Sequence, residues 1–135
     1  MKKSFLFGFL MLMILSSCGD SVITIKTNVT WTDNTGYTAT GDWYLGVWTG
    51  AAFMISQLEG EPFEIVAVTP GTNKTVTVED DPGGSMGGSS ENYTVAVFRD
   101  ANSNGKYDDG EDITGMDSGT GEGGKTLILD VEAYY

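Results

Sequence analysis

The residues from 100 to 111 have the types and spacing of an oxygen-donor site for a metal ion. The run DANSNGKYDDGE satisfies the pattern D-x-[DN]-x-[DN]-G-x5-E at every specified position. Calcium binds about six to eight oxygens, and alternate side chains of a tightly curled loop converge to supply them. The spacing predicts a backbone carbonyl ligand from Lys106 and side-chain ligands from Asp100, Asn102, Asn104, Asp108 and Glu111.

Two further features of this run bear on calcium binding. Gly105 stands where the loop must turn sharply and where a Cβ would clash. The carboxylates of Asp100, Asp108 and Glu111, crowded in one loop, would repel one another without a cation. This favours a bound ion over a solvated Asn-Gly turn, the alternative interpretation. With two neutral Asn ligands, we expect the weak affinity of extracellular calcium modules, and magnesium fits less well because it prefers smaller octahedral shells.

The surroundings of the motif carry a resemblance to known families. The run from Asn92 to Glu111 resembles the DxNxNGxxDxGE loops of bacterial extracellular β-sandwich modules. It is also similar to the loops of dockerins and thrombospondin type 3 repeats. It departs from a true EF-hand because a strand is expected before it and a Gly-rich, non-helical segment after it. The resemblance therefore implies a structural calcium site without the paired helices through which sensor proteins open a groove.

The N-terminus has the features of an export signal. Lys2 and Lys3 precede the apolar stretch 5–15, which is too short for a membrane-spanning helix of about 20 residues. The stretch ends in Leu15-Ser16-Ser17-Cys18, which resembles the lipobox of bacterial lipoproteins. That resemblance implies cleavage before Cys18 and attachment of lipid to its thiol. An ordinary signal peptide with an incidental Cys is the alternative.

The lipobox resemblance implies an organisation and a location for the chain. Residues 1–17 are expected to be the signal peptide, and 18–21 the lipidated Cys with a short tether. Residues 22–135 are expected to be one domain, and the lipid would hold it to a membrane of the bacterial cell envelope, in the periplasm or at the cell surface. The expected partners are the membrane, through the lipid, and an envelope protein or a glycan.

Composition excludes several classes of function. The chain has 135 residues and a net charge of −12, which argues against nucleic acid as a partner because phosphate binding needs Lys and Arg. There is no His, which removes the usual general base and most zinc sites. The single Cys cannot form an internal disulfide. We expect a protein that is not an enzyme; a small carboxylate-based hydrolase is the least favoured alternative, since no Asp/Glu pair is singled out.

Alternation of apolar and polar residues with period two dominates the chain after the tether. We expect an all-β fold, a single antiparallel β-sandwich of six to seven strands, immunoglobulin-like or transthyretin-like. Residues 51–58 suit either a short helix or a strand, and the Gly-rich stretches 82–90 and 115–124 are predicted to be loops. The expected strands cover residues 22–31, 37–48, 63–68, 75–79, 93–99 and 126–133.

The aromatic residues suggest a second hypothesis. Most should fill the core of a small sandwich. Tyr44 and Trp48, however, have the parity opposite to Leu45 and Val47, which makes them candidates for an exposed face that stacks on sugar rings. The favoured function is a calcium-stabilised envelope lipoprotein with a structural or binding role, and the alternative is a carbohydrate-binding module.

Overall fold

The computed structural model describes residues 21–34, 41–52, 58, 60–83 and 89–135. The predicted signal peptide, Cys18 and most of the tether lie outside the described residues, as do parts of the stretches 51–58 and 82–90. In the described part of the chain, no helix is long and apolar enough to cross a membrane.

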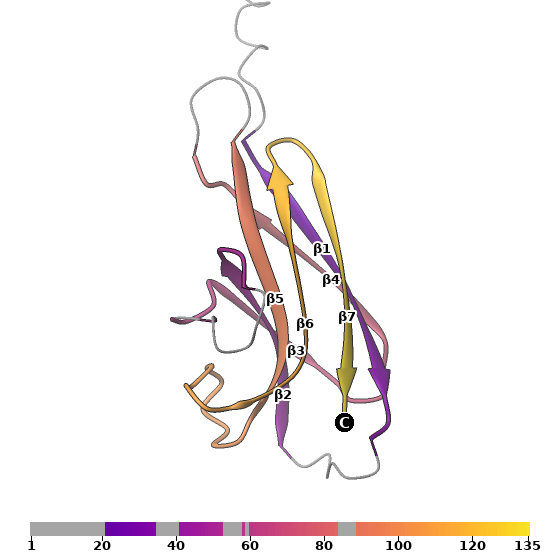
Figure 1. The fold of residues 1–135 in the computed structure, drawn as a ribbon. Helices are drawn as coiled ribbons and strands as arrows, with labels where there is room; N and C mark the ends of the chain where they lie inside the picture. Colours follow the sequence, from indigo (N-terminus) through magenta and orange to yellow (C-terminus); the bar gives the residue numbers. More distant parts are fainter. Residues whose placement is uncertain (1–20, 35–40, 53–57, 59, 84–88) are drawn as a thin grey trace, which may run out of the picture.

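The described residues form seven strands in two packed sheets (Figure 1), so the prediction of an all-β, sandwich-like fold is confirmed. One sheet has three strands in the order β4-β1-β7, and the other has four in the order β3-β2-β5-β6. The strands are β1 (Ile23–Thr32), β2 (Asp42–Thr49), β3 (Glu64–Val68), β4 (Lys74–Asp80), β5 (Ser90–Asp100), β6 (Asp112–Glu122) and β7 (Thr126–Tyr134).

The prediction that all strands pair antiparallel is wrong. β1 and β7 run parallel, in a register from Thr24 opposite Thr126 to Thr32 opposite Tyr134. The short turn after β6 takes the chain from the four-stranded sheet to the three-stranded sheet, and β7 then runs in the direction of β1 (Figure 1). Alternation identifies a strand and its buried face, but it carries no information about the direction of the neighbouring strand.

The main hydrophobic core lies between the two sheets. Strand residues of one parity point inward; in β1 these include Ile23, Ile25 and Val29, all almost fully buried. They meet the inward side chains of β2 and β5 from the opposite sheet. The buried members of this cluster are Ile23, Ile25, Val29, Trp43, Leu45, Val47, Val68, Val76, Tyr93, Val95, Val97, Leu129, Val131 and Ala133.

The prediction of a loop over residues 115–124 is also wrong for most of that stretch, because β6 extends to Glu122. Its glycines face the neighbouring strands closely: a Cβ at Gly115 would collide with the backbone oxygen of Glu132 in β7. A Cβ at Gly121 would lie 2.5 Å from Ile23 Cγ2. These glycines therefore serve a close approach between strands, a use that β-propensity does not anticipate.

The sandwich has two distinct ends (Figure 1). One end carries the first described residues: Ser21 donates a hydrogen bond to Asp81 Oδ1 at 2.6 Å, and Ser90 pairs with Glu122. β5 runs from this end to the other and stops at Asp100. The segment 101–111 therefore lies at the end of the sandwich opposite to the start of the domain.

Candidate metal centre

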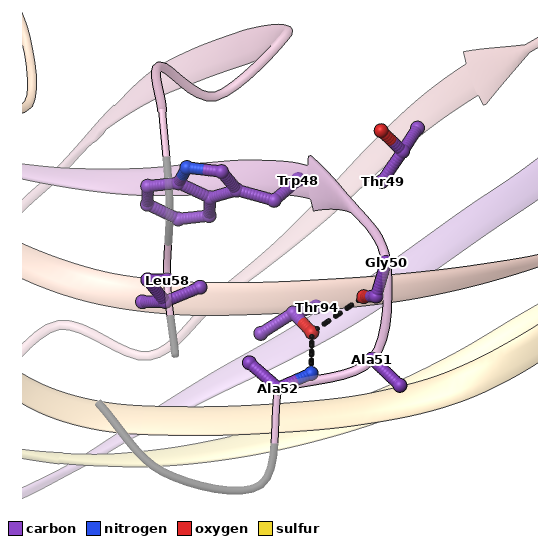
Figure 2. A pocket seen from close by; sticks show the side chains of 7 residues that line it. All are labelled: Trp48, Thr49, Gly50, Ala51, Ala52, Leu58 and Thr94. Carbon is purple, nitrogen blue, oxygen red and sulfur yellow. Dashed lines mark hydrogen bonds between the residues drawn. The ribbon is translucent and has the colours of Figure 1, made fainter. Parts of the chain in front are cut away.

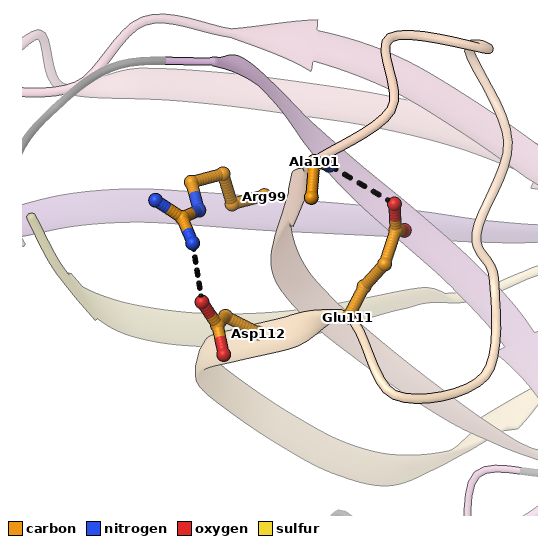
Figure 3. Close-up of polar contacts among 4 residues, drawn as sticks. All are labelled: Arg99, Ala101, Glu111 and Asp112. Carbon is orange, nitrogen blue, oxygen red and sulfur yellow. Dashed lines mark hydrogen bonds and ion pairs between the residues drawn. The ribbon is translucent and has the colours of Figure 1, made fainter.

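The segment with the calcium-loop pattern connects two neighbouring antiparallel strands. β5 ends at Asp100 and β6 begins at Asp112, and Arg99 Nη2 lies 2.7 Å from Asp112 Oδ2 (Figure 3). This ion pair joins the two strands at the base of the loop. The predicted first ligand is thus the last residue of a strand, and its backbone is held by the sheet.

Asp100 is the buried centre of the loop, with 0% of its surface exposed. Its Oδ2 accepts the N–H of Gly105 at 2.7 Å, and its Oδ1 accepts the N–H groups of Asn102 and Asn104 at 3.2 and 3.3 Å. Burial alone would raise the pKa of Asp100, but the surrounding backbone N–H donors outweigh it and hold the pKa below its ordinary value. The carboxylate is therefore ionised at neutral pH.

Asn102, Asn104 and Asp108 are linked through one carboxylate oxygen. The Nδ2 groups of Asn102 and Asn104 donate to Asp108 Oδ2 at 2.7 and 2.6 Å. The amide oxygens face the backbone: Asn102 Oδ1 accepts Asn104 N at 3.0 Å, and Asn104 Oδ1 accepts Lys106 N at 2.8 Å. A cation bound to Asp108 Oδ2 would compete with these two amide donors for the same oxygen.

Glu111 closes the loop from its C-terminal side. Its Oε1 accepts the N–H of Ala101 at 3.1 Å (Figure 3), and its Oε2 accepts the N–H of Asp108 at 3.1 Å. Both carboxylate oxygens therefore turn toward the interior of the loop. The chain turns at Gly105 in the left-handed conformation, with φ of 74°, which favours glycine. The predicted steric clash is wrong, because a Cβ at Gly105 would meet no atom within 4 Å.

The carboxylates alone do not form a metal cage. Among residues 21–34, 41–52, 58, 60–83 and 89–135, no group of three or more His, Cys, Asp and Glu side chains is placed to hold a metal ion. In a loop of this pattern, amide and backbone oxygens supply part of the coordination shell. The predicted ligands Asp100, Asn102, Asn104, Asp108 and Glu111 are drawn together by hydrogen bonds, and Lys106 joins them through its backbone N–H.

Sequence reasoning missed one residue of the loop, Tyr107. Only 9% of its surface is exposed, although it lies in an otherwise polar stretch. Its ring contacts Trp48 and Phe98 edge to face, with centroid distances of 5.3 and 5.2 Å. The available signal was its position as the only large apolar side chain between Asp100 and Asp112.

Trp48 and Tyr44 do not form the exposed stacking face that their parity suggested. Trp48 is 3% exposed, and its Nε1 donates to the backbone oxygen of Gly60 at 3.0 Å. Tyr44 is half-buried and packs against Phe98. The outer face of this sheet is covered by other parts of the chain, so side chains that point away from the main core are nevertheless buried.

A small pocket lies beside Trp48 (Figure 2). It measures about 110 Å³ and is lined by β2, by the segment that follows it and by Thr94. Small-molecule sites are typically about 300–1,000 Å³. The Thr94 hydroxyl there is used internally, since it accepts Ala52 N and donates to the oxygen of Gly50. The pocket therefore does not favour a sugar ligand beside Trp48.

Comparisons with protein-family models, curated proteins and solved structures found no match for the chain. The described residues form a sandwich-like all-β fold with an acidic, Asn-rich loop between β5 and β6.

Proposed function

We propose that this chain is a lipid-anchored protein of the bacterial cell envelope, whose domain binds calcium through residues 100–111. The domain would be a sandwich of the immunoglobulin-like or transthyretin-like type with a structural or binding role and no catalytic activity. The ion would tie the loop to the sheet that carries it. An envelope protein or a glycan is the expected partner.

One observation carries the calcium proposal: all predicted ligand residues take part in one hydrogen-bonded loop around the buried, ionised Asp100. Coordination would use carboxylate oxygens of Asp100, Asp108 and Glu111, amide oxygens of Asn102 and Asn104, and the carbonyl of Lys106. Glu111 already spans the loop through both of its oxygens. Calcium would replace the amide donors that now hold Asp108 Oδ2.

The arrangement of the two ends supports the anchored orientation. Residue 21, the last residue of the proposed tether, lies at one end of the sandwich, and the loop lies at the other (Figure 1). At about 3.3 Å per strand residue, the length of β5 separates these ends by roughly 30 Å. A lipid on Cys18 would thus present the calcium loop away from the membrane. Mass spectrometry of the mature chain tests the anchor. We expect an N-terminal Cys18 with a diacylglyceryl group on its thiol and an acylated amine, and Cys18→Ser should abolish the modification.

Calorimetric titration with calcium, paired with thermal unfolding in EDTA and in calcium, tests the ion. A ligand at a hundred times its dissociation constant stabilises by about 2.7 kcal/mol, which raises the midpoint by roughly 8–15 °C for a domain of this size. Asp108→Asn should weaken binding. Asp109→Asn is its matched control, because it makes the same charge change next door at an exposed position outside the ligand set.

The outcomes separate clearly. Binding that is lost in Asp108→Asn and Glu111→Gln but kept in Asp109→Asn supports the site. Absence of both heat and stabilisation at about 5 mM calcium would overturn it for any affinity typical of extracellular modules. Equal loss in Asp108→Asn and Asp109→Asn would indicate diffuse attraction to an acidic loop instead of coordination.

A further inference from the structure

The loop 100–111 does more than surround a candidate ion, because it also covers apolar surface. A second hydrophobic cluster lies on the outer face of the four-stranded sheet, away from the main core. Its buried members are Trp48, Ala52, Leu58, Ala96, Phe98 and Tyr107, with Tyr44, Ile65, Ile113 and Met116 packed against it. Seven of these ten residues lie in strands, Ala52 and Leu58 follow β2, and Tyr107 is the contribution of the loop.

A bulge in β6 brings that strand into the cluster. Between Val97 and Phe98 the register with β6 shifts, so that Phe98 faces Ile113 while Ala96 faces Met116. One extra residue in a strand turns its following side chains to the other face of the sheet. Ile113 and Met116 therefore both reach the outer face, and the bulge lies next to the loop.

Backbone on either side of Tyr107 is held by candidate ligands. Lys106 N donates to Asn104 Oδ1 at 2.8 Å, and Asp108 N donates to Glu111 Oε2 at 3.1 Å. The side chains that would bind calcium therefore also set the position of Tyr107. An ion that orders these side chains restricts the same short stretch of backbone from which the aromatic ring projects.

The β2 side of the second cluster is held by hydrogen bonds that do not involve the loop 100–111. Trp48 Nε1 donates to Gly60 O, and Thr94 Oγ1 bridges Ala52 N and Gly50 O (Figure 2). These bonds hold residues 50–52 and Gly60, which follow β2, against the sheet. Loss of order in 100–111 would consequently remove Tyr107 from Trp48 and Phe98 while the remainder of the cluster stays in place.

We propose that calcium binding in the loop is coupled to the docking of Tyr107 on Trp48 and Phe98, so that the ion controls how completely the second cluster is covered. This inference rests on the proposed calcium site. Coupling is reciprocal, because an ion that favours docking must bind more tightly when docking is intact. Removal of the ring should therefore weaken the binding of calcium, although the Tyr107 side chain is not a ligand of the ion.

The experiment compares Tyr107→Ala with Tyr135→Ala in the whole chain. Tyr135 is the matched control, since its ring also meets a Trp edge to face, Trp31 at 5.8 Å, and lies outside the loop. Calorimetry with calcium alone should show about tenfold weaker binding for Tyr107→Ala and wild-type binding for Tyr135→Ala. Tyr107→Phe keeps the ring and should bind like wild type, which covers the case in which Tyr107→Ala fails to fold.

Tryptophan fluorescence supplies a second readout. Calcium should change the emission of the wild-type protein, and Trp48→Phe should abolish that change while calorimetry still detects binding. Wild-type affinity in folded Tyr107→Ala, or emission that calcium leaves unchanged, would overturn the coupling but leave the calcium site standing. Absence of calorimetric binding to the wild-type protein would overturn both, and this outcome is recognised before any variant is made.

Discussion

The outer faces of the two sheets differ sharply. The three-stranded sheet shows a polar face on which Asn28 donates to Asp130 Oδ1 at 2.8 Å and accepts from Thr75 at 3.0 Å. The four-stranded sheet has a second apolar cluster on its outer face. The pattern along the strands reflects this: β1 alternates between buried and more exposed positions, whereas Tyr93 to Phe98 in β5 are all buried.

The difference arises because residues outside the strands cover the outer face of the four-stranded sheet. A sheet in a two-layer sandwich normally leaves its outer face to water. Among the residues that the structure describes, Ala52 and Leu58 after β2 and Tyr107 in the loop after β5 form a partial third layer over the four-stranded sheet. The candidate calcium loop belongs to this added layer, so its order has consequences for apolar burial as well as for charge.

Truncation of Phe98 should have the largest effect, and it tests the difference between the outer faces of the two sheets. Phe98 is fully buried on the outer face of the four-stranded sheet, whereas Ile128 on the outer face of the other sheet is 59% exposed. Phe98→Ala should lower the free energy of unfolding by about 3–5 kcal/mol. Ile128→Ala should change it by less than about 0.5 kcal/mol. Urea unfolding of both variants measures the difference, and similar losses would show that the two outer faces contribute equally to stability.

Replacement of a glycine by alanine where the two sheets meet should have an intermediate effect on stability. A Cβ at Gly115 meets backbone of β7, while one at Gly119 meets the flexible end of Leu127 at 3.0 Å. Backbone cannot move aside as a side chain can, so Gly115→Ala should cost about 1–3 kcal/mol of stability. Gly119→Ala should cost less than about 0.5 kcal/mol. Chemical denaturation again measures both, and a tolerated Gly115→Ala would show that β6 and β7 can separate.

The smallest effect concerns pH. Tyr93, between the sheets, donates to Asp80 Oδ2 at 2.7 Å. Burial first, then this hydrogen bond and the nearby negative charges, raise the pKa of Tyr93 well above its ordinary value near 10. The folded state thus favours the neutral phenol. The associated stability is complete below about pH 10 and is lost as the pH rises beyond it, because the unfolded chain ionises first.

Tyr93→Phe should therefore make stability decline less steeply above about pH 10, at a cost of about 1 kcal/mol for the lost hydrogen bond. Burial also raises the pKa of Tyr107, with Asp109 and Glu111 adding to it, so part of the decline should persist. Tyr107→Phe should remove that remainder. Unfolding by urea across the alkaline range measures both slopes. A slope unchanged in Tyr93→Phe would contradict the assignment.

Several features could be predicted because they depend on residues close together in the chain. Alternation located most strands, as in β1, where Ile23, Ile25 and Val29 face the core. The sharp turn at Gly105 followed from the loop pattern. β6 was missed because its glycines have low β-propensity, and their use depends on Glu132 and Ile23, which are distant in sequence.

Some features of the candidate site could likewise be predicted from neighbouring residues, and others could not. Residues 100–111 already contain the donors and acceptors that Asp100, Asp108 and Glu111 use, all within the span of one loop, so spacing alone predicts their proximity. Calcium itself stays a prediction. The burial of Trp48 could not be predicted from its neighbours alone, because part of its cover comes from Tyr107, far along the chain.

The alternating strands, the acidic character of the chain and the composition of the loop can be read from the sequence, because they depend on local spacing and residue type. The parallel pairing of β1 with β7, the Gly-rich strand β6 and the covered outer face of one sheet become visible in the folded protein alone. Strand partners and surface coverage depend on contacts between distant segments, and these contacts form when the whole chain packs.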